Sequence, residues 1–123
     1  MQKISTSIHA THIEYNQQEK ILTITFNTTE KMSYSAEFLR VHSPSAEVQK
    51  HSMSAPTLLY GRKNVAIIDI ENVGNYAIRL TFDDLHDSGI YSWTTLYDFG
   101  TNYTKYWDLY LARLQRENKS RTP

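Results

Sequence analysis

The sequence predicts an α+β domain in which an antiparallel sheet of short strands is covered on one face by helices, with an amphipathic helix near the C-terminus. Two observations lead to this class. Over much of the first two thirds of the chain, apolar and polar residues alternate in short runs between turn-forming residues, as in antiparallel strands. From residue 103 the apolar residues instead recur every three or four positions, as in a helix with one buried face.

The length and composition indicate one neutral domain. The chain has 123 residues, of which 13 are basic and 13 acidic, so its formal net charge is zero. This length fits a single domain, predicted over residues 1–118, and the polar residues 119–123 are predicted to form a disordered tail. A neutral chain lacks the positive field that attracts nucleic acids or anionic membranes, so neither is an expected partner.

The sequence also bears on the cell compartment. It contains no cysteine, so it forms no disulfide and needs no oxidising compartment to fold. Its first residues hold no apolar run of signal-peptide length, and no later segment approaches the roughly 20 apolar residues of a membrane span. We therefore expect a cytoplasmic protein.

The first half of the chain begins with a predicted meander of two or three strands within residues 12–34, whose alternation is clearest at 21–26. Ser35 then precedes a short predicted helix at 36–42, because its hydroxyl can cap the first backbone amides. Proline 44 ends that helix. Most of residues 43–63 is predicted as a connecting loop, with room for one helical turn at 46–49.

The second half holds the strongest strand signal. Residues 65–70 alternate, and a second strand at 76–82 follows the turn residues Gly74 and Asn75. A third predicted strand at 88–93 completes an antiparallel run. Helices are then expected to finish the chain, and the one with a clear apolar stripe carries Tyr103, Tyr106, Trp107, Tyr110, Leu111 and Leu114.

A polar segment joins the last two predicted strands. Asp83, Asp84, His86 and Asp87 lie within five positions between apolar residues. Neighbouring carboxylates favour the protonated form of a histidine, which suits a proton shuttle, and the deprotonated ring could bind a metal. The alternative is an exposed connection between strands, where aspartates are common because they bond nearby backbone amides. The spacing of an EF-hand calcium loop is absent.

A second histidine, His42, follows the first predicted helix, two positions after Arg40. It would meet His86 if that helix packs across this end of the sheet. Its ordinary explanation is a cation that complements the C-terminal end of a helix. The basic turn at 61–63 lacks the Walker pattern, and no nucleophile with its base is recognisable, so no enzymatic activity is predicted.

Three segments carry a resemblance to a known family: EFLRVHSPSAEVQ at 37–49, GRKNVAIIDIENVGNYAIRLTFDD at 61–84 and HDSGIYSWTTLYDFG at 86–100. Over about residues 10–112 the chain resembles the gamma-butyrobetaine hydroxylase-like N-terminal domains, also called domain of unknown function 971, and among them the bacterial stand-alone members. Related domains precede the oxygenase domain of carnitine-pathway hydroxylases or are appended to Mrp-type iron-sulfur carrier ATPases. In neither setting does this domain hold the known chemistry, so the resemblance implies no oxygenase activity.

The resemblance also implies a metal site that this sequence keeps only in part. In the hydroxylases the domain carries zinc on three cysteines and one histidine, which match positions at or near Ser43, Ser45, Val48 and His86 here. A serine hydroxyl is a poor zinc ligand and valine cannot coordinate, so the zinc site implied by the resemblance is absent in that form. His86 is then expected to anchor a polar network between the acidic segment and the helix end.

Two functional hypotheses are compatible with these residues. The first is a non-catalytic accessory domain without a cofactor that binds a protein partner, in a setting that the resemblance links to iron-sulfur or oxygenase systems. The second is a metal-binding domain that holds zinc or iron through His86, His42 and a nearby carboxylate. The interaction surface expected under the first hypothesis, named here the candidate face, consists of Arg40, His42, Asp83, Asp84, His86 and Asp87.

Overall fold

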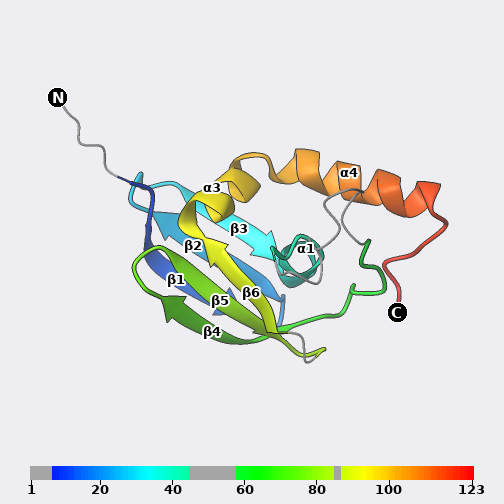
Figure 1. The fold of residues 1–123 in the computed structure, drawn as a ribbon, viewed down its shortest axis with the longest axis horizontal. Coiled ribbons are helices and arrows are strands. Elements are labelled where there is room, and N and C mark those ends of the chain that lie inside the picture. Colours follow the sequence, from blue (N-terminus) through cyan, green and yellow to red (C-terminus); the bar gives the residue numbers. More distant parts are fainter. Residues whose placement is uncertain (1–6, 45–57, 85–86) are drawn as a thin grey trace.

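The computed structural model describes residues 7–44, 58–84 and 87–123, and these form a mixed α+β fold (Figure 1). In chain order the elements are β1 (Ala10–Asn16), β2 (Ile21–Phe26), β3 (Lys31–Ser35), α1 (Ala36–Val41), β4 (Ile67–Val73), β5 (Ala77–Phe82), β6 (Asp87–Ser92), α3 (Trp93–Thr101) and α4 (Tyr103–Arg116).

The strands form two antiparallel three-stranded sheets, ordered β1-β2-β3 and β4-β5-β6. The predicted meander at 12–34 is confirmed as three strands, and the predicted run through 65–93 is confirmed as the second sheet. In the middle strand of each sheet buried and half-buried side chains alternate, because successive side chains point to opposite faces of the sheet. In β2, for example, every second side chain is fully enclosed while those between are half-buried.

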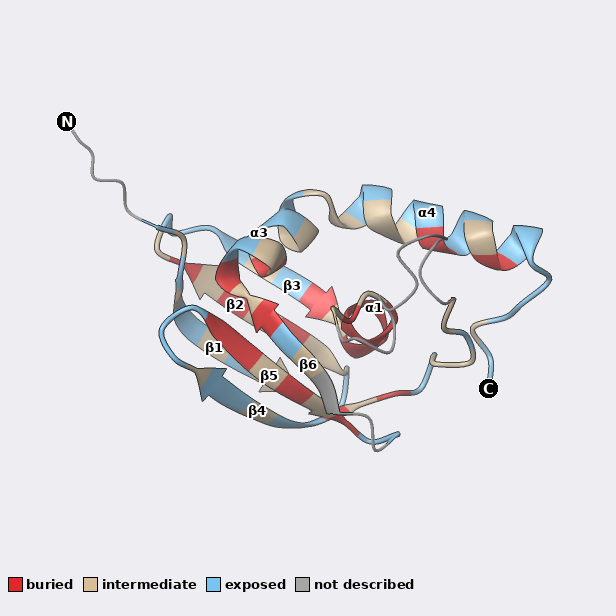
Figure 2. Cartoon of the chain, viewed as in Figure 1, coloured by how far each residue is buried: buried red, intermediate tan, exposed pale blue. Residues whose placement is uncertain are grey.

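One apolar core joins the two sheets. Alternate side chains of the middle strands point into it, and removing each from water stabilises the fold by about 1.5–3 kcal/mol. The residues that the two middle strands contribute are Leu22, Ile24, Phe26, Ile78, Leu80 and Phe82. Figure 2 shows this buried interior running through both sheets and continuing into α1, the helix that follows β3 directly.

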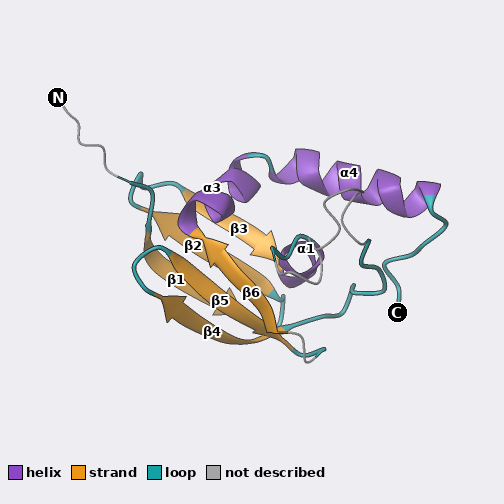
Figure 3. Cartoon of the chain, viewed as in Figure 1, coloured by secondary structure: helices purple, strands orange, loops and turns teal. Residues whose placement is uncertain are grey.

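The helices lie together on one side of the strands, as predicted (Figure 3). The helix α3 packs against β3 and begins at Trp93. Ser92 caps it, because its Oγ accepts a hydrogen bond from the backbone N–H of Thr95 at 3.1 Å. The sequence prediction extended the strand to residue 93 and did not identify α3 separately. The predicted C-terminal helix is confirmed as α4, which buries Tyr110 and Leu114 but leaves Leu111 largely exposed.

Residues 119–123 differ from the prediction of a disordered tail, because the structure gives them defined partners. The N–H groups of Gly61 and Lys63 donate to the carbonyl oxygens of Ser120 and Arg121 at 2.9 and 3.0 Å. Gly61 adopts a positive φ of 68°, a conformation that favours glycine, beside this tail. The prediction considered apolar periodicity alone, whereas polar contacts hold this segment.

Two further points complete the architecture. The helical turn allowed at 46–49 lies outside the described residues. Among the residues described, none of the helices has the length and apolar character required to cross a bilayer.

Candidate functional site

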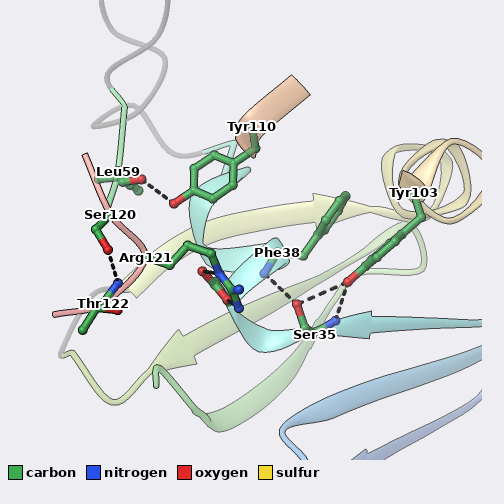
Figure 4. Close-up of polar contacts among 9 residues, drawn as sticks. Ser35, Phe38, Leu59, Tyr103, Tyr110, Ser120, Arg121 and Thr122 are labelled. Carbon is green, nitrogen blue, oxygen red and sulfur yellow. Dashed lines mark hydrogen bonds and ion pairs between the residues drawn. The ribbon is translucent and has the colours of Figure 1, made fainter. Parts of the chain in front are cut away.

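The helix α1 is the element on which the candidate site is built. Ser35 caps it, because its Oγ accepts a hydrogen bond from the N–H of Phe38 at 3.0 Å. The hydroxyl of Tyr103 accepts a hydrogen bond from the Ser35 N–H at 3.1 Å and donates one to Ser35 Oγ at 3.2 Å (Figure 4). The start of α1 is therefore fixed by both its own cap and the first residue of α4.

Every residue of α1 is buried, including two that carry charge. The side chain of Arg40 is only 3% exposed, and that of Glu37 only 5%. A buried charge is strongly unfavourable unless an opposite charge and hydrogen bonds compensate it. Both side chains have such a partner in a distant part of the chain.

The partner of Arg40 is Asp84, at the end of β5. Arg40 Nε donates to Asp84 Oδ2 at 2.8 Å, and Nε of Arg62 lies 3.0 Å from the same oxygen. One carboxylate therefore lies between two guanidinium groups, which leaves one net positive charge at this point. Two predicted members of the candidate face are thus brought together, and they are joined by Arg62, which the sequence prediction assigned to a basic turn with no role in the site.

The neighbouring Asp83 has a structural role. Its N–H donates to the carbonyl of Ala66 at 2.9 Å, and its Oδ1 accepts from the N–H of Ala66 at 3.1 Å. This reciprocal pair joins the end of β5 to the segment that leads into β4. It is the kind of aspartate-to-backbone contact expected of a polar connection between strands.

A pocket of about 290 Å³ opens beside these groups. Arg62 and Asp84 supply charge to it, and the turn at residue 61 and the end of the tail form part of its wall. Its lining residues are Gly61, Arg62, Asn64, Val65, Asp83, Asp84 and Pro123. Convergent polar groups at a concave surface are the usual features of a recognition site.

His42 occupies a different environment. Its Nδ1 lies 2.8 Å from the carbonyl oxygen of Phe38, and its ring lies 4.3 Å from the Phe38 ring, centroid to centroid. The rings of Phe99, Tyr106 and Tyr110 surround it at centroid distances of 5.8 to 6.0 Å. Burial lowers the pKa of His42 below its usual value, so the ring is neutral near pH 7.

The predicted metal ligands belong to two segments, one after α1 and one after β5 in sequence. His86 and the side chain of Asp87 lie outside the described residues, as do Ser45 and Val48. Within the described ranges, no three histidine, aspartate or glutamate side chains gather so as to hold a metal ion. Ser43 is fully buried and offers a hydroxyl where a thiolate would be needed, so it does not fit a cysteine-based zinc site.

The partner of Glu37 is Arg121, which the sequence prediction placed in the tail. Arg121 Nε and Nη2 donate to the two carboxylate oxygens of Glu37 at 2.9 and 2.7 Å, across 84 positions of sequence. No spacing rule reveals such a pair. The available signal was an acidic residue in a short helix whose other positions are mostly apolar.

Comparisons with known proteins agree with the fold. The family model described as "Gamma-butyrobetaine hydroxylase-like, N-terminal" matches residues 13–97. Two NMR solution structures are similar to this chain, each at 43% identity. The first has a TM-score of 0.81 and covers 94% of this chain and 90% of its own. The second has a TM-score of 0.82 and covers 100% of this chain and 92% of its own.

A crystal structure from Acidithiobacillus ferrooxidans ATCC 23270 shows the same fold at lower identity. It is described as a protein of unknown function of the domain of unknown function 971 family. It is 24% identical, with a TM-score of 0.60, over 72% of this chain and 88% of its own. A search of curated proteins gave no match.

Proposed function

The chain belongs to the gamma-butyrobetaine hydroxylase-like N-terminal family, and on this premise we propose that it is a non-catalytic accessory domain that binds a protein partner through the candidate face. The family is one of unknown function, so the proposal depends on the residues of this chain. A setting in iron-sulfur or oxygenase systems is part of the same proposal, since the related domains named above occur there.

The observation that carries the proposal is the shared carboxylate of Asp84. Asp84 Oδ2 is ion-paired with both Arg40 and Arg62, and a guanidinium group, which stays protonated, cannot serve as the base of a nucleophile. The same contacts hold charged groups of both signs in fixed positions at the rim of the pocket of about 290 Å³, which Arg62, Asp83 and Asp84 line. Fixed charges of this kind select partners of complementary charge and speed their association.

Arg62 offers the sharper test, because Arg40 and Asp84 also support the fold. Arg62 contacts Asp84 of the candidate face and is 32% exposed, so Arg62→Ala removes a charge beside this face without opening the core. The matched control is Arg79→Ala. Arg79 is similarly exposed, at 38%, and lies 3.4 Å from Glu71 on the second sheet, away from the proposed surface.

The experiment captures partners from cell extract by cross-linking to the purified chain, then measures the affinity of each partner as a purified protein. We expect Arg62→Ala to weaken binding of the true partner at least about tenfold, which corresponds to about 1.4 kcal/mol, while Arg79→Ala leaves it unchanged. Equal affinity for Arg62→Ala and the unmodified chain would remove this face as the binding surface.

Metal binding is the second candidate, and one observation favours it. A carbonyl oxygen can only accept a hydrogen bond, so Nδ1 of His42 donates to Phe38 and the neutral ring keeps its lone pair on Nε2. Metal-bound histidines commonly use this arrangement, in which one nitrogen bonds the backbone and the other is free to coordinate. The proposed ligands are His42, His86 and a nearby carboxylate, with zinc or iron as the metal.

Elemental analysis of the tag-free protein tests this second candidate. If it is correct, zinc or iron is present at one equivalent and is lost in His86→Ala. His12→Ala serves as the control, because His12 is exposed on β1, where it lies 3.6 Å from the carboxylate of Glu14. Metal-free protein, or retention of metal by His86→Ala, would eliminate the candidate.

A further inference from the structure

The contact between Glu37 and the tail has the features of a peptide-binding site rather than a surface ion pair. Glu37 is 5% exposed and binds its partner through both carboxylate oxygens, whereas Arg121 keeps 38% exposure. The carboxylate is thus part of the enclosed body, and the guanidinium reaches it from an outer segment. Figure 4 shows Arg121 directed from the tail toward α1, with Tyr110 on the adjoining helix.

Aromatic side chains of α4 lie beside the contact between Glu37 and Arg121. The guanidinium carbon of Arg121 lies 5.2 Å from the ring centroid of Trp107, within the range of a cation–π contact. The hydroxyl of Tyr110 donates to the carbonyl of Leu59 at 2.8 Å, which holds the loop at 58–60 beside α4. Burial, with the nearby charge of Glu37, raises the pKa of Tyr110 to about 12, so this hydroxyl keeps its proton.

Backbone groups supply the rest of the binding site. The N–H groups of Gly61 and Lys63 donate to successive carbonyls of the tail, at 2.9 Å to Ser120 and 3.0 Å to Arg121. Recognition of an extended peptide commonly combines backbone hydrogen bonds, which give affinity, with a side-chain pocket, which gives specificity. Both parts are present here.

We propose that Glu37, Trp107 and the backbone of residues 61–63 form a receptor for an arginine in an extended peptide segment. The tail occupies this receptor in the structure, and a protein partner that presents an arginine in an extended segment takes its place. The inference concerns other residues than the candidate face and stands without the proposed function.

The chemistry of this receptor selects arginine over lysine. A planar guanidinium offers two parallel N–H groups that match the two oxygens of a carboxylate, and its flat face stacks on an aromatic ring. An ammonium group is a compact point charge with stronger hydration, so it reproduces neither contact fully. The opposing charge on the receptor also requires a basic rather than an acidic partner.

Displacement of the tail would also change the pocket of about 290 Å³ beside Arg62 and Asp84. Pro123, which follows the bound arginine by two positions, lines the pocket beside Arg62 and Asp84. An incoming segment that replaces the tail would replace one wall of that pocket. The tail competes only moderately with an incoming segment for the receptor, because a tethered segment acts at an effective concentration of about millimolar.

The experiment uses the full chain with Arg121→Ala, which removes the arginine side chain and keeps its receptor. The first probe is ethylguanidinium at millimolar concentration, with ethylammonium as the matched control, and the readout is the thermal unfolding midpoint. We expect ethylguanidinium to raise the midpoint in a saturable manner and ethylammonium to leave it nearly unchanged. In the double variant Glu37→Gln/Arg121→Ala neither compound should act, because the carboxylate is gone.

The second probe is the acetylated, amidated peptide Lys-Ser-Arg-Thr-Pro, compared with the version in which lysine replaces arginine. Binding is followed by NMR titration. The arginine peptide should bind Arg121→Ala at least about tenfold more tightly than it binds the unmodified chain, whose tail competes. If Arg121→Ala does not fold, both the thermal unfolding measurement and the NMR titration are made on Arg121→Gln.

Three results with the small compounds would overturn the inference. They are the absence of any saturable effect of ethylguanidinium, an equal effect of ethylammonium, and an equal effect in the double variant. Equal binding of the arginine and lysine peptides would overturn it as well, because selectivity for guanidinium is its central claim.

Discussion

Asp84 Oδ2 lies 2.8 Å from Nε of Arg40, so the end of β5 is joined to the buried face of α1 across 44 positions of sequence. Asp84→Asn keeps the side-chain volume but removes the negative charge. Because Arg40 remains buried, we expect a loss of about 2–4 kcal/mol in the free energy of unfolding, measured by urea denaturation. Glu71→Gln, in an exposed ion pair with Arg79, should change it by less than about 0.5 kcal/mol. Similar losses for the two variants would contradict the assignment.

Tyr34 provides a second test of a buried polar contact. Its side chain is fully buried and its hydroxyl donates to the carbonyl of Leu96 at 2.6 Å, linking β3 to α3. Burial also raises its pKa. Tyr34→Phe leaves that carbonyl without this donor and should cost about 1–3 kcal/mol of unfolding free energy in urea. Tyr76→Phe, on an exposed tyrosine, is expected to have no measurable effect.

The cap of α1 is expected to be energetically coupled to α4. Ser35→Ala removes the acceptor for the Phe38 N–H and should cost about 1 kcal/mol, and up to about 2. Because Tyr103 also bonds Ser35, the double variant Ser35→Ala/Tyr103→Phe should lose less than the sum of the single losses, by about 0.5 kcal/mol or more. Strictly additive losses in a double-mutant cycle would show that the cap acts independently of α4.

His42 should make stability depend on pH. Burial lowers its pKa in the folded state below the unfolded value of about 6.5, so the unfolded chain binds more protons below that pH. The stability associated with neutral His42 is therefore fully present above pH 6.5 and declines as the pH falls through the folded pKa. Urea denaturation from pH 7.5 to pH 5 should show this decline, and His42→Phe should reduce it, whereas His12→Ala should retain it.

Gly100 is predicted to be intolerant of a side chain because of its neighbour on β3. A methyl group at Gly100 would overlap the Met32 side chain and lie 2.9 Å from Met32 Cβ. Gly100→Ala should therefore destabilise the fold by about 1–3 kcal/mol despite the higher helix propensity of alanine. Met32→Ala in the same chain should recover part of the loss, and thermal unfolding of the four variants measures the coupling. A stabilising Gly100→Ala would disprove this close packing.

The sequence predicted the fold well where the signal is local. Alternation in 21–26, the hydroxyl of Ser35 and the spacing of the α4 stripe each report on neighbours within a few residues, and each was confirmed. The helix α3 could have been found in the same way, since Ser92 precedes Trp93, Leu96 and Tyr97 at helical spacing. The prediction assigned residues 88–93 to a strand, so it missed the start of α3 at Trp93.

The candidate site was harder to predict because its contacts are between distant residues. The sequence drew attention to Arg40 and Asp84 but could not show that they touch, nor that Arg62 joins them. It also predicted that His42 could meet His86, which lies outside the described residues, but it did not predict the aromatic rings that surround His42. Arg121 was placed in a disordered tail because hydrophobic periodicity carries no information about a buried carboxylate elsewhere in the chain.

The 84-residue separation of Glu37 and Arg121 also affects how the protein emerges during synthesis. A ribosome makes α1 long before Arg121, so in a nascent chain the Glu37 carboxylate lacks this counterion until 84 further residues have been added. Contacts of such long sequence separation slow folding, since the intervening loop must close first. The strands of both sheets are synthesised before Arg121, whereas α1 reaches its final environment only after the ribosome has made Arg121.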